Sequence, residues 1–258
     1  MQNNLIYFII EIILEQLPIS SSGHIQLFSS LYNQTTNEAI CSYLPHLFLL
    51  GLYIPFLVTI ITQIINKSIT LLFKFGFLIF IMSFTTLLTI TGISLTCQNY
   101  TIYPPLWLGF LLTTITLFLF KKHNIGKGKP YYHLTFHEAI LLGIAQACAF
   151  LPGLSRMATI LLTCSISGYT KENAFYIAII SNSCISLYSC INILYHNHQN
   201  TLNYIFSFSL LEVVYMQIAF FIAIICFYMI KYIITKNKIT IFYWYELFIA
   251  LVSFYFKI

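Results

Sequence analysis

The chain has 258 residues, of which 59% are hydrophobic and only 7% are charged, and its mean hydropathy is +0.85. This composition excludes an ordinary soluble globular domain and favours a protein that crosses a membrane several times. The formal net charge is +5, aspartate is absent, and the single arginine, Arg156, lies in an apolar stretch. Because ionisable side chains at membrane depth are costly, Arg156 is a candidate functional residue.

Residues 5–32 contain a short apolar segment, a break at Leu17-Pro-Ile-Ser-Ser-Ser-Gly23 and a second short segment. Glu11 and Glu15 interrupt the first segment, which argues against a cleaved signal peptide. Neither segment is long enough to cross a bilayer alone. Broken backbone at membrane depth is tolerated where it is buried in protein or lines a wet cavity, so the pattern predicts a re-entrant helical hairpin.

Six apolar runs have about the length of a membrane-spanning helix, although the third is marginal. The runs are 44–65, 75–95, 104–120, 173–194, 208–230 and 239–256. Among them only the last two contain a charged residue, Glu212 and Glu246 respectively. The sequence therefore predicts an all-α integral membrane protein with six transmembrane helices.

Residues 121–136 form a basic connection between the third and fourth runs. Its lysines are expected to orient the chain and to contact anionic lipid headgroups, and we predict no nucleic-acid site. The spacing of His133, His137 and Glu138 is compatible with a metal site, but these residues end the basic connection, so a solvated loop followed by a helix start is the favoured interpretation.

Residues 137–167 repeat the pattern of the first hairpin, with a break at Leu151-Pro-Gly-Leu-Ser-Arg-Met157. Each predicted hairpin precedes three of the six runs, which indicates an internal repeat. The expected organisation is one polytopic membrane domain, 1–258. Repeat one covers about 1–120 and repeat two about 137–258, with the basic connection at about 121–136.

The lysines predict the orientation of this domain. If both hairpins return to their side of entry, ten lysines fall on one side of the membrane and only Lys257 on the other. The ten are Lys67, Lys74, Lys121, Lys122, Lys127, Lys129, Lys171, Lys231, Lys236 and Lys238. Positive residues concentrate on the cytoplasmic side, so both termini are expected outside. The hairpins then enter from opposite faces, and their tips can meet near the midplane as an inverted-topology repeat.

Glu11 and Glu15 are spaced i, i+4, which places their side chains on one helix face at roughly 6 Å. Two carboxylates at that separation repel unless a divalent cation or a shared proton intervenes. Mg²⁺ or Ca²⁺, bound by these oxygens and by substrate phosphate oxygens, is the natural occupant. The alternative is a pair of glutamates that reach to water from a membrane boundary.

The residues after Pro18 point to anion chemistry. Ser20, Ser21 and Ser22 are expected to open the second half-helix, whose N–H groups and dipole favour an anion, although helix capping would explain one of them. His24 is a candidate nucleophile, activator of a serine or proton donor. Arg156 offers a bidentate fork to phosphate, or a structural partner for a buried glutamate.

Two motifs carry a resemblance to a known family. Residues 11–24, Glu-Ile-Ile-Leu-Glu-Gln-Leu-Pro-Ile-Ser-Ser-Ser-Gly-His, resemble the ExxxExxPxSSxGH motif of the undecaprenyl-pyrophosphate phosphatase (bacitracin-resistance) family. Residues 143–156, which end in Pro-Gly-Leu-Ser-Arg, are similar to its second motif, which continues as PGxSRSGxT. Here Met157, Ala158 and Ile160 replace the Ser, Gly and Thr of that pattern, and Thr159 is the neighbouring hydroxyl. We expect Ala158 to occupy a turn in which glycine is less constrained.

The resemblance implies hydrolysis of undecaprenyl pyrophosphate to the monophosphate that carries envelope polymers, in the bacterial inner membrane, with the site open to the periplasmic face. It implies catalysis by Glu15, Ser21, His24 and Arg156, with the order of Ser21 and His24 open. Substrate-binding residues would be Ser20, Ser22, Gly23, Ser155 and Thr159, and Glu11 and Glu15 would hold a divalent cation, Mg²⁺ or Ca²⁺.

Three questions remain open at the level of sequence. Inverted repeats with broken helices are also transporter architecture, so a polyprenyl-phosphate transporter or flippase is the alternative function. The replacements at Met157, Ala158 and Ile160 raise the further alternative of an inactive chain. The partners expected are the lipid substrate and the bilayer, and a homodimer is left open.

Overall fold

The computed structural model describes residues 2–32, 38–99, 104–123, 128–196 and 209–256. Within these ranges the secondary structure is helical, apart from one isolated bridge between Lys129 and Tyr169. The elements are α1 Gln2–Leu14, α2 Ser21–Tyr32, α3 Glu38–Ile65, α4 Ile69–Asn99, α5 Leu106–Lys122, η1 Tyr131–His133, α6 Phe136–Cys148, α7 Arg156–Ile166, α8 Lys171–His196, α10 Leu210–Thr235 and α11 Thr240–Tyr255.

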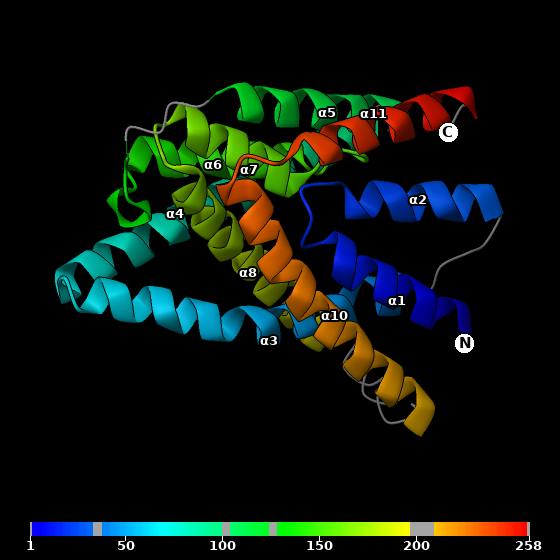
Figure 1. Cartoon of the computed structure of the whole chain (residues 1–258), viewed down its shortest axis with the longest axis horizontal. Helices are drawn as coiled ribbons and strands as arrows, with labels where there is room; N and C mark the ends of the chain where they lie inside the picture. The colour runs from blue at the N-terminus through cyan, green and yellow to red at the C-terminus, as the bar shows by residue number, and fades with distance from the viewer. Residues whose placement is uncertain (1, 33–37, 100–103, 124–127, 197–208, 257–258) are drawn as a thin grey trace.

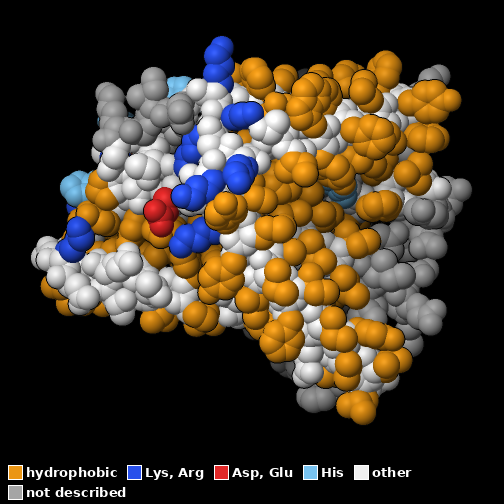
Figure 2. Space-filling model, in the orientation of Figure 1, with side chains coloured by type: hydrophobic (Ala, Val, Ile, Leu, Met, Phe, Trp, Pro, Cys, Tyr) orange, Lys and Arg blue, Asp and Glu red, His pale blue; other side chains and the backbone are white. Residues whose placement is uncertain are grey.

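Within the described residues each of the six apolar runs falls on one helix, which confirms the all-α prediction. Among the described residues, four helices are long and apolar enough to cross a membrane, with candidate spans Pro45–Ile65, Ile69–Ile93, Lys171–Asn192 and Val213–Thr235. The other two helices on predicted spans, α5 and α11, have 17 and 16 residues and are shorter than a typical crossing helix. Apolar side chains are exposed over much of the outer surface, as expected where lipid replaces water (Figure 2).

Both predicted breaks separate pairs of short helices. The first lies between α1 and α2, and the second between α6 and α7. Each second helix begins with the same cap: the Ser20 hydroxyl accepts from the Gly23 N–H at 3.2 Å, and the Ser155 hydroxyl accepts from the Ala158 N–H at 3.3 Å. A serine cap satisfies an otherwise unpaired N–H of the first turn, so each break ends where its serine begins a helix.

The two halves of the chain exchange packing partners. Helix α5 of the first half lies beside α11 of the second (Figure 1), and α3 packs against α8. Helix α4 packs against α6, and α10 packs against α1, so each half supplies a long helix that covers the hairpin of the other. This crossed arrangement brings the two breaks together in the interior.

Close backbone contact fixes the tip of the second hairpin against α5. Gly153 has φ +86°, a left-handed conformation that favours glycine, and a Cβ on Gly109 would lie 1.9 Å from the Pro152 carbonyl oxygen. The buried Thr113 hydroxyl donates to the Gly153 carbonyl and accepts from the Ser155 N–H, each at 2.8 Å. Thr113 thereby satisfies two backbone groups of a non-helical segment that is buried among helices.

Candidate functional site

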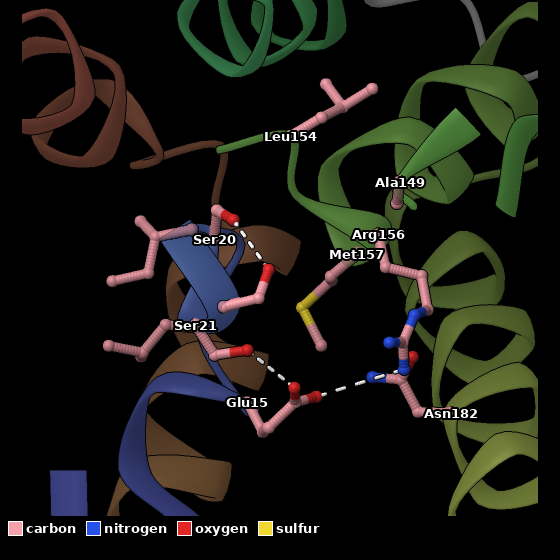
Figure 3. Close-up of a pocket in the computed structure, with 11 residues that line it drawn as sticks. Glu15, Ser20, Ser21, Ala149, Leu154, Arg156, Met157 and Asn182 are labelled. Atoms are coloured by element: carbon pink, nitrogen blue, oxygen red, sulfur yellow. Dashed lines mark hydrogen bonds and ion pairs between the residues drawn. The ribbon is translucent and has the colours of Figure 1, made fainter. Parts of the chain in front are cut away.

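A polar pocket lies between the two breaks, and Glu15 lines it between Ser21 and Arg156 (Figure 3). The Ser21 hydroxyl donates to Glu15 Oε1 at 2.5 Å. Arg156 Nη1 lies 3.9 Å from Glu15 Oε2, on the other side of the carboxylate. The structure therefore brings together three of the residues that the sequence singled out, although Arg156 is 135 or more positions away from the other two in the chain.

The N-termini of α2 and α7, which are the positive ends of their helix dipoles, meet at this pocket. Ser21 is the first residue of α2 and Arg156 is the first residue of α7. The N-terminus of a helix carries unpaired N–H groups and a partial positive charge, so it favours an anion. Two such termini with one guanidinium can bind a phosphate group, while Glu15 supplies an adjacent proton acceptor.

His24 does not line this pocket. Its ring lies between Phe110 of α5 and Tyr245 of α11, with ring centroids 5.2 and 5.5 Å away. Its Nδ1 contacts the Ser20 carbonyl oxygen at 2.5 Å and its Nε2 contacts the Tyr245 hydroxyl at 2.8 Å. With both ring nitrogens engaged, His24 is placed to hold α2 against the pair formed by α5 and α11.

The other predicted binding residues divide into two groups. Ser20 and Ser22 line the pocket, and their hydroxyl oxygens are 3.5 Å apart. Gly23 packs directly against the Gly153 backbone. Ser155 caps α7, and the Thr159 hydroxyl donates to the Arg156 carbonyl at 2.8 Å, so both hydroxyls bond to backbone beside the pocket.

The residues that depart from the second motif fit the helix without strain. Met157 lines the pocket, and Ala158 and Ile160 are fully buried in α7. Among the described residues only Asn237 is a non-glycine with positive φ. The expectation that Ala158 occupies a turn better suited to glycine is therefore wrong, because Ala158 lies in the first helical turn and donates its N–H to Ser155.

Three polar residues of the site were not predicted. Asn182 of α8 lines the pocket, and buried His46 of α3 lies close enough to interact electrostatically with Glu15 and Arg156. Glu246 of α11 is fully buried, and its Oε1 accepts the Ser20 N–H at 3.2 Å. Glu246 carried a usable signal, a carboxylate within an apolar run. Asn182 and His46 lie on helices that also supply core residues. Only the packing of those helices shows that the two side chains reach the site.

The donor set suits a hard cation only with help from substrate or water. Glu11 is buried, and its Oε2 has no hydrogen-bond partner among the described residues, which is the kind of oxygen that a cation would satisfy. Within the described ranges, however, no group of three or more His, Cys, Asp or Glu side chains is arranged to hold a metal. Magnesium commonly binds through one or two carboxylates plus phosphate and water oxygens, and that mode fits Glu11 and Glu15.

The basic connection ends in a capped helix, as the favoured interpretation required. The Thr135 hydroxyl and the Glu138 carboxylate form a capping box at the start of α6. Lys129 Nζ contacts Glu138 Oε1 at 2.5 Å, and the exposed His133 and His137 flank this turn. Of the lysines that predict the orientation, Lys127 and Lys257 lie outside the described residues.

Comparisons with known proteins agree with the two motifs. The model of the bacitracin resistance protein BacA family matches residues 4–252. An undecaprenyl-diphosphatase of Thermosipho africanus is 27% identical over 98% of this chain and 99% of its own length. One from Thermosipho melanesiensis is 29% identical over 95% of both chains, and one from Methanococcus maripaludis is 26% identical over 93% and 94%. This chain belongs to the bacitracin resistance protein BacA family.

Proposed function

We propose that this protein is a membrane phosphatase that hydrolyses undecaprenyl pyrophosphate to undecaprenyl phosphate and inorganic phosphate, which recycles the lipid carrier for cell-wall and envelope polymers. The observation that carries the proposal is the Ser21–Glu15–Arg156 arrangement at the meeting point of two helix N-termini. Family membership and relatives named undecaprenyl-diphosphatase support it. A pocket that only binds an anion would not need the Ser21 hydroxyl to be hydrogen-bonded to the Glu15 carboxylate, which can accept its proton.

The proposed topology has six transmembrane helices, two re-entrant hairpins and inverted repeats, in one polytopic domain. The exchange of α4 and α10 between the hairpins supports the repeat, because an inverted two-fold relation pairs these helices. The short helices α5 and α11 pack against each other, and apolar side chains such as Phe118 and Phe248 are exposed on their outer faces, so they can cross as a pair. We place the chain in the bacterial inner membrane with the site open to the periplasmic face, on the lysine distribution.

In the proposed reaction Ser21 is the nucleophile. Glu15 accepts the hydroxyl proton as the Ser21 oxygen attacks the terminal phosphorus, and the bond from that phosphorus to the bridging oxygen breaks. Undecaprenyl phosphate leaves, and a phosphoserine remains. Glu15 gives the first proton up to solvent. Water then attacks the same phosphorus and gives a proton to Glu15, the bond from that phosphorus to the Ser21 oxygen breaks, and Glu15 returns the proton to that oxygen as inorganic phosphate leaves. Arg156 and the N–H groups that open α2 and α7 stabilise charge on the transferring phosphoryl group.

The other residues of the first motif then have supporting roles. Ser20 and Ser22 contact the pyrophosphate, while Gly23, Ser155 and Thr159 shape the two helix starts around it. His24 positions α2 through its bond to Tyr245. A Mg²⁺ or Ca²⁺ ion held by Glu11, Glu15 and phosphate oxygens would supply charge neutralisation for the pyrophosphate when bound.

An apolar groove next to the pocket suits the polyprenyl chain. It has a volume of about 470 Å³, lies between α4, α6 and α8, and shares Ser22 and Arg156 with the polar pocket. Leu87 of α4, Ile185 of α8 and Phe150 after α6 line it. A lipid whose pyrophosphate is at Arg156 could therefore extend its tail along this groove toward the bilayer.

The test is phosphate release from undecaprenyl pyrophosphate by the purified protein in detergent, compared with Ser21→Ala, Glu15→Gln and Arg156→Ala. We expect release by the wild type only, loss of release with a chelator, and recovery with Mg²⁺ or Ca²⁺. Release by all three variants would contradict the assigned site. No release by the wild type, together with movement of polyprenyl phosphate between leaflets of a vesicle, would favour the transporter alternative.

A further inference from the structure

A second polar cavity, of about 590 Å³, lies away from the candidate site, where α8 begins and α10 ends. Three lysines line it, Lys171 from α8 and Lys231 and Lys236 from the end of α10 and the residue that follows it. Figure 2 shows that basic side chains gather on this part of the molecule, while apolar side chains cover most of the rest of that face. The cavity shares no lining residue with the Arg156 pocket.

Within the part of the chain that the structure describes, Lys171 has no partner for its charge. Its Nζ atom is buried, and no hydrogen-bond partner for it exists among the described residues. The Nζ atom lies over the Phe120 ring, whose centroid is 5.4 Å away. A buried ammonium group is costly unless it is paired, so this lysine lacks the counter-ion that a bound anion would supply.

The other charges of the lining only partly balance one another. Lys231 Nζ lies 4.0 Å from Glu172 Oε1 and 3.4 Å from the Tyr176 hydroxyl. Glu172 Oε1 also accepts from that hydroxyl at 2.6 Å. Glu172 thus offsets Lys231, and the lysines at 171 and 236 leave two positive charges in the cavity, which match the charge of a phosphate monoester dianion.

The position along the spans sets the depth of the cavity. Lys171 is the first residue of the candidate span Lys171–Asn192, and Lys231 lies in the last turns of Val213–Thr235. Both ends lie at the predicted cytoplasmic side. Basic pockets between helices at that level are suited to anionic headgroups, and the phosphate can equally arrive from solution.

We propose that this cavity binds a phosphate monoester group through Lys171 and Lys236, as a second site separate from the Arg156 pocket. The binding is independent of the proposed phosphatase activity. If that activity holds, its lipid product is a phosphate monoester, and its other product, inorganic phosphate, presents the same kind of anionic oxygens.

The test uses the full chain with Arg156→Ala, so that phosphate in the candidate active site does not contribute. In detergent, inorganic phosphate is titrated and its affinity is measured by calorimetry. Lys171→Gln with Lys236→Gln should weaken binding by about tenfold or more, because charge-assisted contacts to the anion are lost. The matched control is Lys74→Gln with Lys122→Gln, which removes two exposed lysines from the same predicted side and should leave the affinity unchanged.

A lipid arm separates the two sources of the group. Phosphatidylcholine nanodiscs containing phosphatidic acid, a monoester, are compared with nanodiscs containing phosphatidylglycerol, a diester. Binding of free phosphate supports the proposal if the Lys171→Gln and Lys236→Gln substitutions abolish that binding. Binding of phosphatidic acid but not of phosphatidylglycerol supports it on the same condition. Equal binding by the Lys171→Gln, Lys236→Gln variant and by its control would overturn the proposal. It would also be overturned if the protein does not bind inorganic phosphate and shows no preference for phosphatidic acid over phosphatidylglycerol.

A further variant tests the proposal even if the Lys171→Gln, Lys236→Gln variant is unstable. Glu172→Gln deletes the negative charge of the lining and should strengthen binding of inorganic phosphate several-fold by the same electrostatic argument. Weaker binding in that variant would overturn the proposed charge balance. Because every measurement is made without Arg156, failure of the phosphatase assay leaves the result of this titration intact.

Discussion

The role of Arg156 can be tested directly by substitution. A guanidinium presents two parallel donors to a phosphate, whereas an ammonium is a compact point charge with a different reach. We expect Arg156→Lys to remain in the membrane and to lose phosphate release by about a thousandfold, which corresponds to about 4 kcal/mol of transition-state stabilisation. Wild type, Arg156→Lys and Arg156→Ala are compared at matched protein levels.

The alternative for Arg156 predicts a different result. In the structure Arg156 faces Glu15 at 3.9 Å, a distance at which a lysine could preserve the charge pairing. If the pair is only structural, Arg156→Lys would keep most of its turnover. Near-normal phosphate release by the lysine variant would therefore count against Arg156 as the phosphate clamp.

Ser21 and His24 can be separated by the stability of a trapped intermediate. The Ser21 hydroxyl donates to Glu15 in the pocket, whereas both nitrogens of His24 are engaged outside it. With substrate labelled on its terminal phosphate and rapid quenching, we expect label on the protein that survives acid, as a phosphoserine does. Ser22→Ala should retain the label and Ser21→Ala should lose it. Label that acid removes would instead indicate His24.

At this scale the sequence predicted residue types better than residue roles. The motif spacing identified Glu15, Ser21 and Arg156 because their chemistry is unusual in an apolar chain. The hydroxyls of Ser155 and Thr159 were expected at the substrate, yet both bond to backbone atoms of α7. A serine that precedes a helix is equally suited to a ligand or to a cap, and only the direction of its side chain separates these uses.

At the scale of the elements, each hairpin is anchored by the last helix of the other half. Thr113 of α5 accepts the Ser155 N–H at 2.8 Å, and Glu246 of α11 accepts the Ser20 N–H at 3.2 Å. The two anchors act at equivalent positions, immediately before Arg156 in one hairpin and before Ser21 in the other. The distance between these two residues across Glu15 therefore depends on how α5 and α11 pack together.

Thr113→Val tests this anchoring with almost no change of shape. It leaves the Ser155 N–H and the Gly153 carbonyl without their partner, at a cost of about 1–3 kcal/mol for each buried group. We expect a lower unfolding temperature in detergent and weaker phosphate release. Thr114→Val is the control, because among the described residues the Thr114 hydroxyl donates only to the Phe110 carbonyl, within α5. Equal behaviour of the two variants would contradict the anchoring role.

The groove between α4, α6 and α8 makes a prediction about substrate length. Leu87 lines the groove, and the adjacent Leu88 is exposed on α4 without lining it. Leu87→Trp should raise KM for undecaprenyl pyrophosphate by about tenfold and leave KM for farnesyl pyrophosphate nearly unchanged, because only the long chain needs the filled volume. Leu88→Trp should change neither value. A similar rise for both substrates would argue that the groove does not hold the tail.

For the whole molecule, the pattern of apolar runs and charges predicted where the helices break but not which helices pack together. Residues 5–32 and 137–167 were predicted to break at 17–23 and 151–157, because proline, serine and glycine punctuate an otherwise apolar chain. The structure shows that Ser20 and Ser155, within those segments, cap the second helices. The exchange of α4 and α10 between halves was not predictable, because both helices are apolar around most of their surface and periodicity does not select their partners. Packing against α6 and α1 selects them instead.

The lysine distribution makes the last prediction, which concerns the orientation of the whole chain. The end of α5 carries Lys121 and Lys122, while α10 begins near Ser209 at the other end of the helical bundle. In a variant without the seven native cysteines, Lys122→Cys should resist an impermeant thiol reagent in intact cells and react after permeabilisation. Ser209→Cys should react in both conditions. The opposite pattern would invert the molecule, and the Arg156 pocket and the lysine-lined cavity would exchange their sides of the membrane. Reaction of both positions in intact cells would contradict an odd number of crossings between them, and with it the inverted repeat.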